Sequence, residues 1–180
     1  MPHIFLNHEL PGIRSLAAFR PETGKPLYDL AQVLLHHDSP LSKAERELIA
    51  GYVSRVNQCE FCCNSHSAAS RAHYGESEGI VDEVLQNGAS SALSPKVNSL
   101  LKIARKVAIG GREVQQADID AARAAGAEDR DIHDTVLIAA AFSMYNRYVD
   151  GLATTLPENP DSYIEMGKRM AFVGYVPPKH

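Results

Sequence analysis

The 180-residue chain is 44% hydrophobic and 22% charged, and its formal net charge is −4 at pH 7. These values are typical of a globular protein of one domain with a substantial core. The acidic balance argues against a nucleic-acid partner, which normally needs a basic excess. The longest apolar run, residues 136–142, is too short to cross a bilayer, and residues 1–9 lack the charged and apolar regions of a signal peptide. We therefore expect neither nucleic acid nor a membrane as a partner.

Four prolines interrupt residues 1–26, which we predict to be irregular, although their apolar side chains indicate that the segment packs on the body. Beyond it the apolar spacing is helical, with cap residues at most ends; Ser42 and Glu45, for example, have the spacing of a capping box. No stretch alternates as a strand does. The sequence therefore predicts a single all-α domain over residues 1–180. The expected helices span residues 27–37, 43–57, 59–74, 78–86, 95–109, 117–125, 129–154 and 162–170.

Glu47 admits two interpretations. On a helical wheel it lies away from the apolar face of its helix, which predicts a solvent-exposed side chain. Its neighbours on that side are small, namely Ala50, Gly51 and Ser54. Small residues let another helix approach closely, and a carboxylate in such a seam would be desolvated and would need a hydrogen-bond partner. The residue pattern alone leaves both interpretations open.

Two segments of the chain resemble each other. Residues 48–57 align without gaps to residues 137–146, with Leu, Ile, Ala, Ser and Asn at matching positions. The second copy lacks the cysteines that follow the first. The match suggests an internally duplicated helical unit, in which two long helices pack as related partners and only the first carries chemistry.

The chain has three cysteines, Cys59, Cys62 and Cys63. Three are too few for a disulfide framework, and an odd number leaves at least one unpaired. A reducing, cytoplasmic location is therefore the better expectation, and there a Cys-x-x-Cys pair indicates redox or metal chemistry. Cys63 is typical of a buried free cysteine.

Cys59, Cys62 and His66 fall along one stripe of a helix, at positions i, i+3 and i+7, and the stripe continues to His73. A helix N-terminus would stabilise a thiolate at Cys59. A thioredoxin-like site needs a preceding strand, and a c-type haem site needs histidine directly after the second cysteine; the sequence has neither. A zinc site remains an alternative, although three ligands on consecutive turns of one helix suit a tetrahedral metal poorly. A fourth ligand would come from His73, Cys63 or the pair His36–His37.

The pattern Glu47-x11-Cys59-x2-Cys62-x3-His66, within Glu-Arg-Glu-Leu-Ile-Ala-x-x-Val-Ser-x-x-Asn-x-Cys, resembles the alkylhydroperoxidase AhpD core of the carboxymuconolactone decarboxylase-like superfamily. Residues 11–27 and the run Tyr-Asn-Arg at 145–147 are similar to its peroxidase-related branch, so the resemblance covers about residues 11–155.

The resemblance implies an all-α fold, a homo-oligomer (trimer or hexamer) and thiol peroxidase activity without metal or haem. It also implies that Glu47, Cys59, Cys62 and His66 form a proton relay and a redox dithiol, with a hydroperoxide as substrate and an external lipoyl- or thioredoxin-like dithiol as reductant. The chain departs from AhpD at Phe61, where AhpD has a histidine, and this puts the rate and the natural reductant in question.

Two arguments differ over which cysteine attacks the peroxide. The helix N-terminus favours a thiolate at Cys59, whereas the i, i+4 pairing with His66 and the resemblance favour Cys62. We predict that Cys62 attacks, and that Cys59 resolves the intermediate and faces the reducing partner. Two other classes of function remain: a decarboxylase or lactone-processing enzyme of the same superfamily, which needs no dithiol, and a non-catalytic redox-sensing oligomer.

Overall fold

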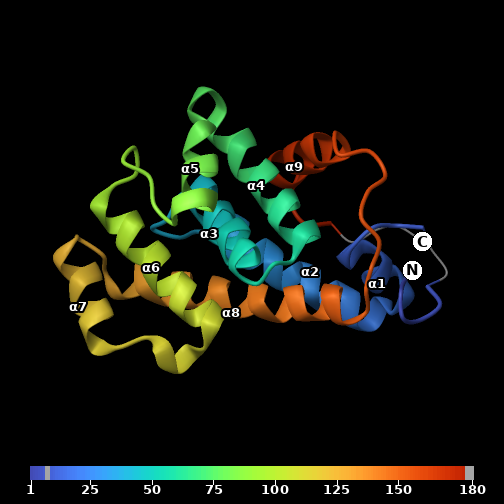
Figure 1. The fold of residues 1–180 in the computed structure, drawn as a ribbon, viewed down its shortest axis with the longest axis horizontal. Coiled ribbons are helices and arrows are strands. Elements are labelled where there is room, and N and C mark those ends of the chain that lie inside the picture. The colour runs from blue at the N-terminus through green and yellow to red at the C-terminus, as the bar shows by residue number, and fades with distance from the viewer. Residues whose placement is uncertain (7–8, 177–180) are drawn as a thin grey trace.

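The computed structural model describes residues 1–6 and 9–176. This part of the chain consists of α-helices and short 3₁₀ turns without strands (Figure 1), so the predicted all-α class is confirmed. The elements are α1 (Ile13–Phe19), α2 (Pro21–His36), α3 (Lys43–Val56), α4 (Glu60–Tyr74), η1 (Gly75–Ser77), α5 (Gly79–Asn87), α6 (Pro95–Ile109), η2 (Gly111–Glu113), α7 (Gln116–Ala124), α8 (Asp129–Gly151) and α9 (Ser162–Phe172). No helix among the described residues has the length and apolar character needed to cross a bilayer.

The prediction that residues 1–26 are irregular is wrong from Ile13 onward, because α1 and the start of α2 lie there. Pro21 does not prevent the helix, since it is at the first helical position, where no backbone N–H is needed. Gly24 lets α1 and α2 touch, because a Cβ at that position would lie 2.7 Å from the Ala17 Cα. The segment does pack on the body, and Leu16 is completely buried.

Helix α3 lies at the centre of the fold and packs against α4 on one side and α6 and α8 on the other. Helix α8 runs along one edge of the molecule, and α9 covers α4 on the opposite edge (Figure 1). The predicted capping box at the start of α3 is present: the Glu45 backbone N–H donates to Ser42 Oγ over 3.2 Å, and the Ser42 N–H donates to Glu45 Oε2 over 2.8 Å. The central helix therefore begins at the residue that its sequence predicts.

The two segments of the internal repeat lie on α3 and α8 and contact each other reciprocally. Asn146 Nδ2 donates to Ser54 Oγ over 3.0 Å, and Asn57 Nδ2 donates to Ser143 Oγ over 3.2 Å. Asn57 also donates to Asn146 Oδ1 over 2.9 Å. Because the repeat aligns Ser54 with Ser143 and Asn57 with Asn146, each serine bonds the asparagine of the other copy. The contacts agree with the expectation that the two helices of the repeat pack against each other as related partners.

Small residues bring α4 close to the helices on both of its sides. A Cβ at Gly51 would lie 2.9 Å from Ser67 Oγ, and Ser70 Oγ donates to the Ala44 carbonyl over 3.0 Å. On the other side of α4, a Cβ at Gly167 of α9 would lie 2.5 Å from the carbonyl carbon of Ala68. Helices α3 and α9 therefore both pack closely against the middle of α4, at Ser67 and Ala68.

Candidate functional site

Glu47 and His66 form a buried hydrogen-bonded pair between α3 and α4. Glu47 Oε2 lies 2.8 Å from His66 Nδ1, and the exposed fractions of the two residues are 0% and 8%. The solvent-exposed interpretation of Glu47 is therefore wrong, and the seam interpretation is correct. Its physical reason is the close approach of α4 at Gly51, which seals the small-residue side of α3 from water. A carboxylate enclosed in this way is stabilised by a strong donor, and here that donor is an imidazole.

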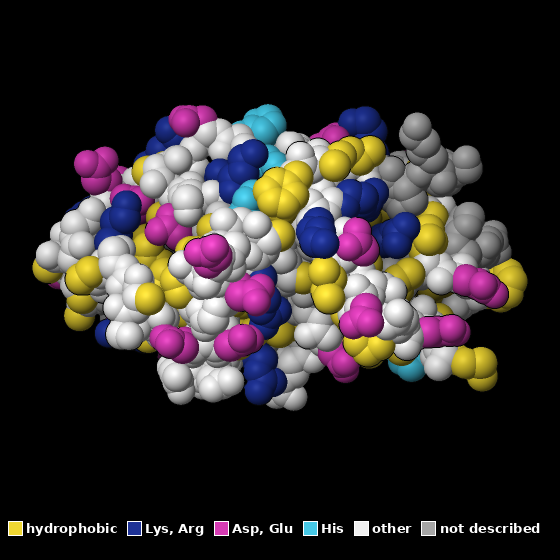
Figure 2. Space-filling model, turned by 90° about the horizontal axis from the view of Figure 1, so that it is seen from above, with side chains coloured by type: hydrophobic (Ala, Val, Ile, Leu, Met, Phe, Trp, Pro, Cys, Tyr) yellow, Lys and Arg dark blue, Asp and Glu magenta, His cyan; other side chains and the backbone are white. Residues whose placement is uncertain are grey.

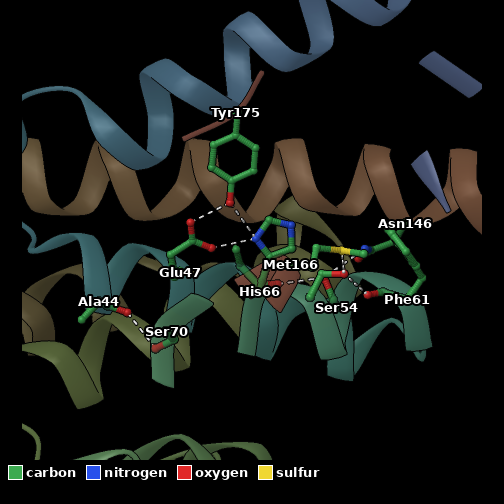
Figure 3. Close-up of polar contacts among 11 residues, drawn as sticks. Ala44, Glu47, Ser54, Phe61, His66, Ser70, Asn146, Met166 and Tyr175 are labelled. Carbon is green, nitrogen blue, oxygen red and sulfur yellow. Dashed lines mark hydrogen bonds and ion pairs between the residues drawn. The ribbon is translucent and has the colours of Figure 1, made fainter. Parts of the chain in front are cut away.

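Tyr175, which follows α9, completes this polar cluster from the far end of the chain. Its hydroxyl donates to Glu47 Oε1 over 2.6 Å and lies 3.2 Å from His66 Nδ1, as Figure 3 shows. The two rings are stacked, with centroids 6.0 Å apart and planes within 10° of each other. Burial and the nearby Glu47 carboxylate raise the pKa of Tyr175 well above 10, so that it remains a hydrogen-bond donor at neutral pH.

The carboxylate fixes the orientation of His66. Because Nδ1 faces Glu47, the Nδ1–H tautomer donates to the carboxylate and leaves Nε2 as a proton acceptor. The second ring nitrogen points away from Glu47 in Figure 3. Phe142 contacts the imidazole edge-on, with ring centroids 4.4 Å apart, and holds the ring in this position.

The two cysteines of the Cys-x-x-Cys pair lie at the start of α4. Gln58 adopts a left-handed conformation with φ of 62°, and this tight turn makes Cys59 the N-cap residue of α4. Both thiols are free. A hydrogen bond with Cys59, together with burial, raises the pKa of the Cys62 thiol well above its usual value, and a hydrogen bond with Asn146 opposes this shift. Cys62 therefore holds its proton at neutral pH until a base removes it.

The expectation that Cys59 faces a partner is wrong for this structure. Cys59 is completely buried, because Leu16 of α1 and Val149 of α8 pack over it. Cys62 has an exposed fraction of only 3%, yet it lines a cavity of about 60 Å³. Cys62 is thus the cysteine that a small molecule in the cavity would meet first.

The cavity lies between α4, α9, α8 and the first two helices. Its lining is mostly apolar, and it brings together Cys62, His66 and Tyr175. The remaining lining residues are Ile13, Arg14, Leu27, Tyr28, Ala31, Phe61, Ser65, Phe142, Tyr145, Met166, Arg169, Met170 and Gly174. Phe61, which replaces the histidine of AhpD, packs against Tyr163, with ring centroids 6.1 Å apart. A Cβ on Gly12 would overlap the Phe61 ring, so that α1 closes tightly over this end of the cavity.

The other candidate ligands and thiol lie outside the cavity. Cys63 is buried on another face of α4, and burial raises its pKa. His73 contacts Phe172, and its ring centroid is 6.5 Å from that of His36. Burial lowers the pKa of both histidines. Within the described part of the chain, no group of three or more His, Cys, Asp and Glu side chains is arranged to hold a metal ion.

Three residues at the site are not found by sequence reasoning: Tyr175, Asn146 and Arg14. Tyr175 is 128 residues from Glu47, and its only local signal is an aromatic residue between a glycine and the proline pair at the end of the chain. Asn146 has a better signal, because the internal repeat aligns it with Asn57, two residues before Cys59. Arg14 has none.

The described part of the chain is thus an all-α protein that has a buried Glu47–His66 pair and, at the start of α4, two free cysteines, Cys59 and Cys62. A model of the Carboxymuconolactone decarboxylase family matches residues 21–106, which include Glu47, Cys59, Cys62 and His66. This match and the structural relatives described next support an AhpD-like protein of the carboxymuconolactone decarboxylase superfamily. No curated protein matches the chain.

Two solved structures resemble most of the chain. An uncharacterised peroxidase-related protein from Silicibacter sp. has a TM-score of 0.76 and 29% identity, and the match covers 86% of this chain and 78% of that one. An AhpD-core, peroxidase-related protein from Ralstonia eutropha has a TM-score of 0.76 and 28% identity, over 88% and 82% of the two chains. A protein of unknown function from Agrobacterium tumefaciens shares the fold, with a TM-score of 0.67, 24% identity and coverage of 80% and 97%.

Proposed function

We propose that the protein is a thiol-dependent hydroperoxide reductase in which Cys59 and Cys62 form the redox dithiol and Glu47 and His66 the proton relay. The observation that carries this proposal is that Cys62 and His66 line one cavity, while the buried Glu47 carboxylate bonds the opposite nitrogen of His66 over 2.8 Å. The peroxidase-related names of the two similar structures support the same reaction class.

In the first step, His66 Nε2 accepts the Cys62 proton, and the thiolate attacks the terminal oxygen of the hydroperoxide. The S–O bond forms as the O–O bond breaks, and the proton passes from His66 to the departing alkoxide to give the alcohol. Cys62 is left as a sulfenic acid. The raised pKa of Cys62 makes the base necessary, because the free thiolate is scarce at neutral pH. Glu47 stabilises the imidazolium that forms transiently.

In the second step, the Cys59 thiol attacks the Cys62 sulfur, a Cys59–Cys62 disulfide forms, and water leaves. The hydrogen-bonded contact between the two thiols places the resolving group beside the sulfur that it attacks. An external dithiol then returns both cysteines to the thiol state by exchange. Because Cys59 is completely buried and Cys62 lines the cavity, the reductant reaches the disulfide at Cys62.

We also propose that the protein forms a homo-oligomer through α8. One stripe of this helix is exposed although its centre is apolar: Leu137 and Met144 have exposed fractions of 39% and 46%, with Ala140 between them. Residues at this spacing form one face of a helix. A second helix packing on that face would bury it.

The experiment that tests the function is a peroxide-consumption assay with tert-butyl hydroperoxide and dihydrolipoamide, in which Cys62→Ser is compared with Cys63→Ser. The proposal predicts turnover in the parent and in Cys63→Ser, and none above the buffer rate in Cys62→Ser. A redox sensor would oxidise once without turning over. A decarboxylase or lactone-processing enzyme would leave the peroxide untouched in all three proteins.

A further inference from the structure

The cavity beside Cys62 has charged groups of one sign only. Arg14 from α1 and Arg169 from α9 contribute to its lining, and no aspartate or glutamate does. The rest of the lining is apolar or neutral, apart from the titratable groups of Cys62, His66 and three tyrosines. Two guanidinium groups beside an otherwise apolar cavity indicate a ligand with an apolar body and an anionic end.

Among the described residues, Arg14 and Arg169 have no acidic partner. Arg14 Nε is buried and has no hydrogen-bond partner in residues 1–6 and 9–176. In that same part of the chain neither Arg14 nor Arg169 forms an ion pair, although nine other ion pairs are present. Burial raises the pKa of Tyr28, and the charges of both arginines oppose the shift. Both guanidinium groups therefore lie near one residue of the cavity wall.

The size of the cavity limits the ligand. Its volume is about 60 Å³, and one water needs roughly 10–15 Å³ of such space, so about four to six non-hydrogen atoms fit inside. Arg14, Met166 and Arg169 also line the groove outside, where the N-terminal segment meets the start of α9. In Figure 2, Lys and Arg side chains gather on the face over α9, with acidic side chains between them.

We propose that the cavity binds small organic hydroperoxides that carry a carboxylate, with the peroxide at Cys62 and the carboxylate held by Arg14 and Arg169. A guanidinium matches a carboxylate through two parallel hydrogen bonds, and a bound carboxylate would supply the partner that Arg14 Nε lacks. Glu9, Glu158, Asp161 and Glu165 line the outer groove. They favour a ligand with a single negative charge over a polyanion.

This inference takes the reacting group from the proposed function, but its test does not depend on turnover. Titration calorimetry at low salt compares butanoate with butanamide, which has the same shape without the charge and the same six non-hydrogen atoms. Both are added to the reduced parent, to Arg14→Gln, to Arg169→Gln and to the control Arg20→Gln. Arg20 is exposed and does not line the cavity.

The proposal predicts that the parent and Arg20→Gln bind the acid at least about tenfold more tightly than the amide, and that added salt reduces this preference. Either cavity variant should lose most of the preference. Equal binding of acid and amide by the parent would overturn the proposal, even if a variant failed to fold. A preference that survives in both cavity variants would overturn it as well. If the protein prefers the acid but does not consume tert-butyl hydroperoxide, the carboxylate site stands and the proposed reaction fails.

Discussion

Tyr175 and Glu47 lie 128 residues apart and share a hydrogen bond of 2.6 Å, which ties the end of the chain to the central helix. The carboxylate at the centre of this contact is completely buried. It accepts from Tyr175 on one oxygen and from His66 on the other (Figure 3). The segment after α9 is thus part of the wall of the site.

Tyr175→Phe should destabilise the fold. It should also slow peroxide turnover, but by a smaller factor than Glu47→Gln does. A hydrogen bond to a charged group contributes about 1.5–3 kcal/mol, and its removal leaves one carboxylate oxygen without a donor. Urea unfolding measures the loss of stability. The matched control is Tyr74→Phe, because the Tyr74 hydroxyl is buried without a partner among the described residues. Equal stability of the two variants would show that the Tyr175 contact contributes nothing.

Glu47→Gln should lower peroxide turnover by at least about tenfold while the fold is kept, since general acid–base assistance is typically worth about 10²–10⁴-fold. Glutamine preserves the shape and a hydrogen bond to His66, but it removes the charge that stabilises the imidazolium. Steady-state turnover with a saturating reductant is the measurement.

The control for this change is Glu45→Gln on the same helix. Glu45 closes the capping box with Ser42, so its loss should weaken the start of α3 by about 0.5 kcal/mol and leave the chemistry intact. If both variants turned over peroxide like the parent, Glu47 would be a structural carboxylate and the relay would be wrong.

In His66→Gln, which lacks the base, the rate of peroxide reduction should rise with pH across the neutral range, because the Cys62 proton then leaves to solvent. The pKa of Cys62 is raised by its bond with Cys59 and by burial, so the thiol is mostly protonated there. Below that pKa the thiolate fraction grows about tenfold per pH unit, and the attack rate follows it. Single-turnover thiol loss between pH 6 and pH 9 tests this in His66→Gln, with the double variant His66→Gln/Cys63→Ser as the control that should give the same profile. A flat profile would mean that Cys62 is already ionised at pH 6.

Sedimentation should show an oligomer at micromolar concentration, and Met144→Glu should shift it toward the monomer of 19.6 kDa. The change places a charge at one end of the exposed stripe of α8, where a packed partner helix would desolvate it. Ile109→Glu is the control, because Ile109 is exposed at 62% on α6 and lies outside the stripe. A parent protein that sediments as a compact monomer contradicts the proposed assembly.

Features that depend on neighbours in sequence were predictable. The Ser42–Glu45 capping box, the helix over the Cys-x-x-Cys segment and the all-α class follow from spacings of three and four residues, and the structure has all of them. The start of α2 does not follow from treating proline as a helix breaker, because Pro21 takes the first helical position, where no backbone N–H is needed.

Features that depend on tertiary packing were not predictable in the same way. The wheel of α3 could not decide whether Glu47 is exposed, because that depends on how closely α4 approaches at Gly51. Cys59 is buried by Leu16 and Val149, which are far from it in the sequence. Tyr175 and Arg14 reach the site through the packing of α9 and α1, for which no short-range pattern exists.

The most direct test of the central claim is a stoichiometric reaction without any reductant. One equivalent of tert-butyl hydroperoxide is added to the pre-reduced protein, and thiols, alcohol and disulfides are measured after a single turnover, the last by non-reducing peptide mapping. We predict one alcohol formed and two thiols lost per chain, a Cys59–Cys62 disulfide, and Cys63 still reduced. A Cys62–Cys63 linkage, or peroxide consumption no faster than that of Cys62→Ser, would contradict the account.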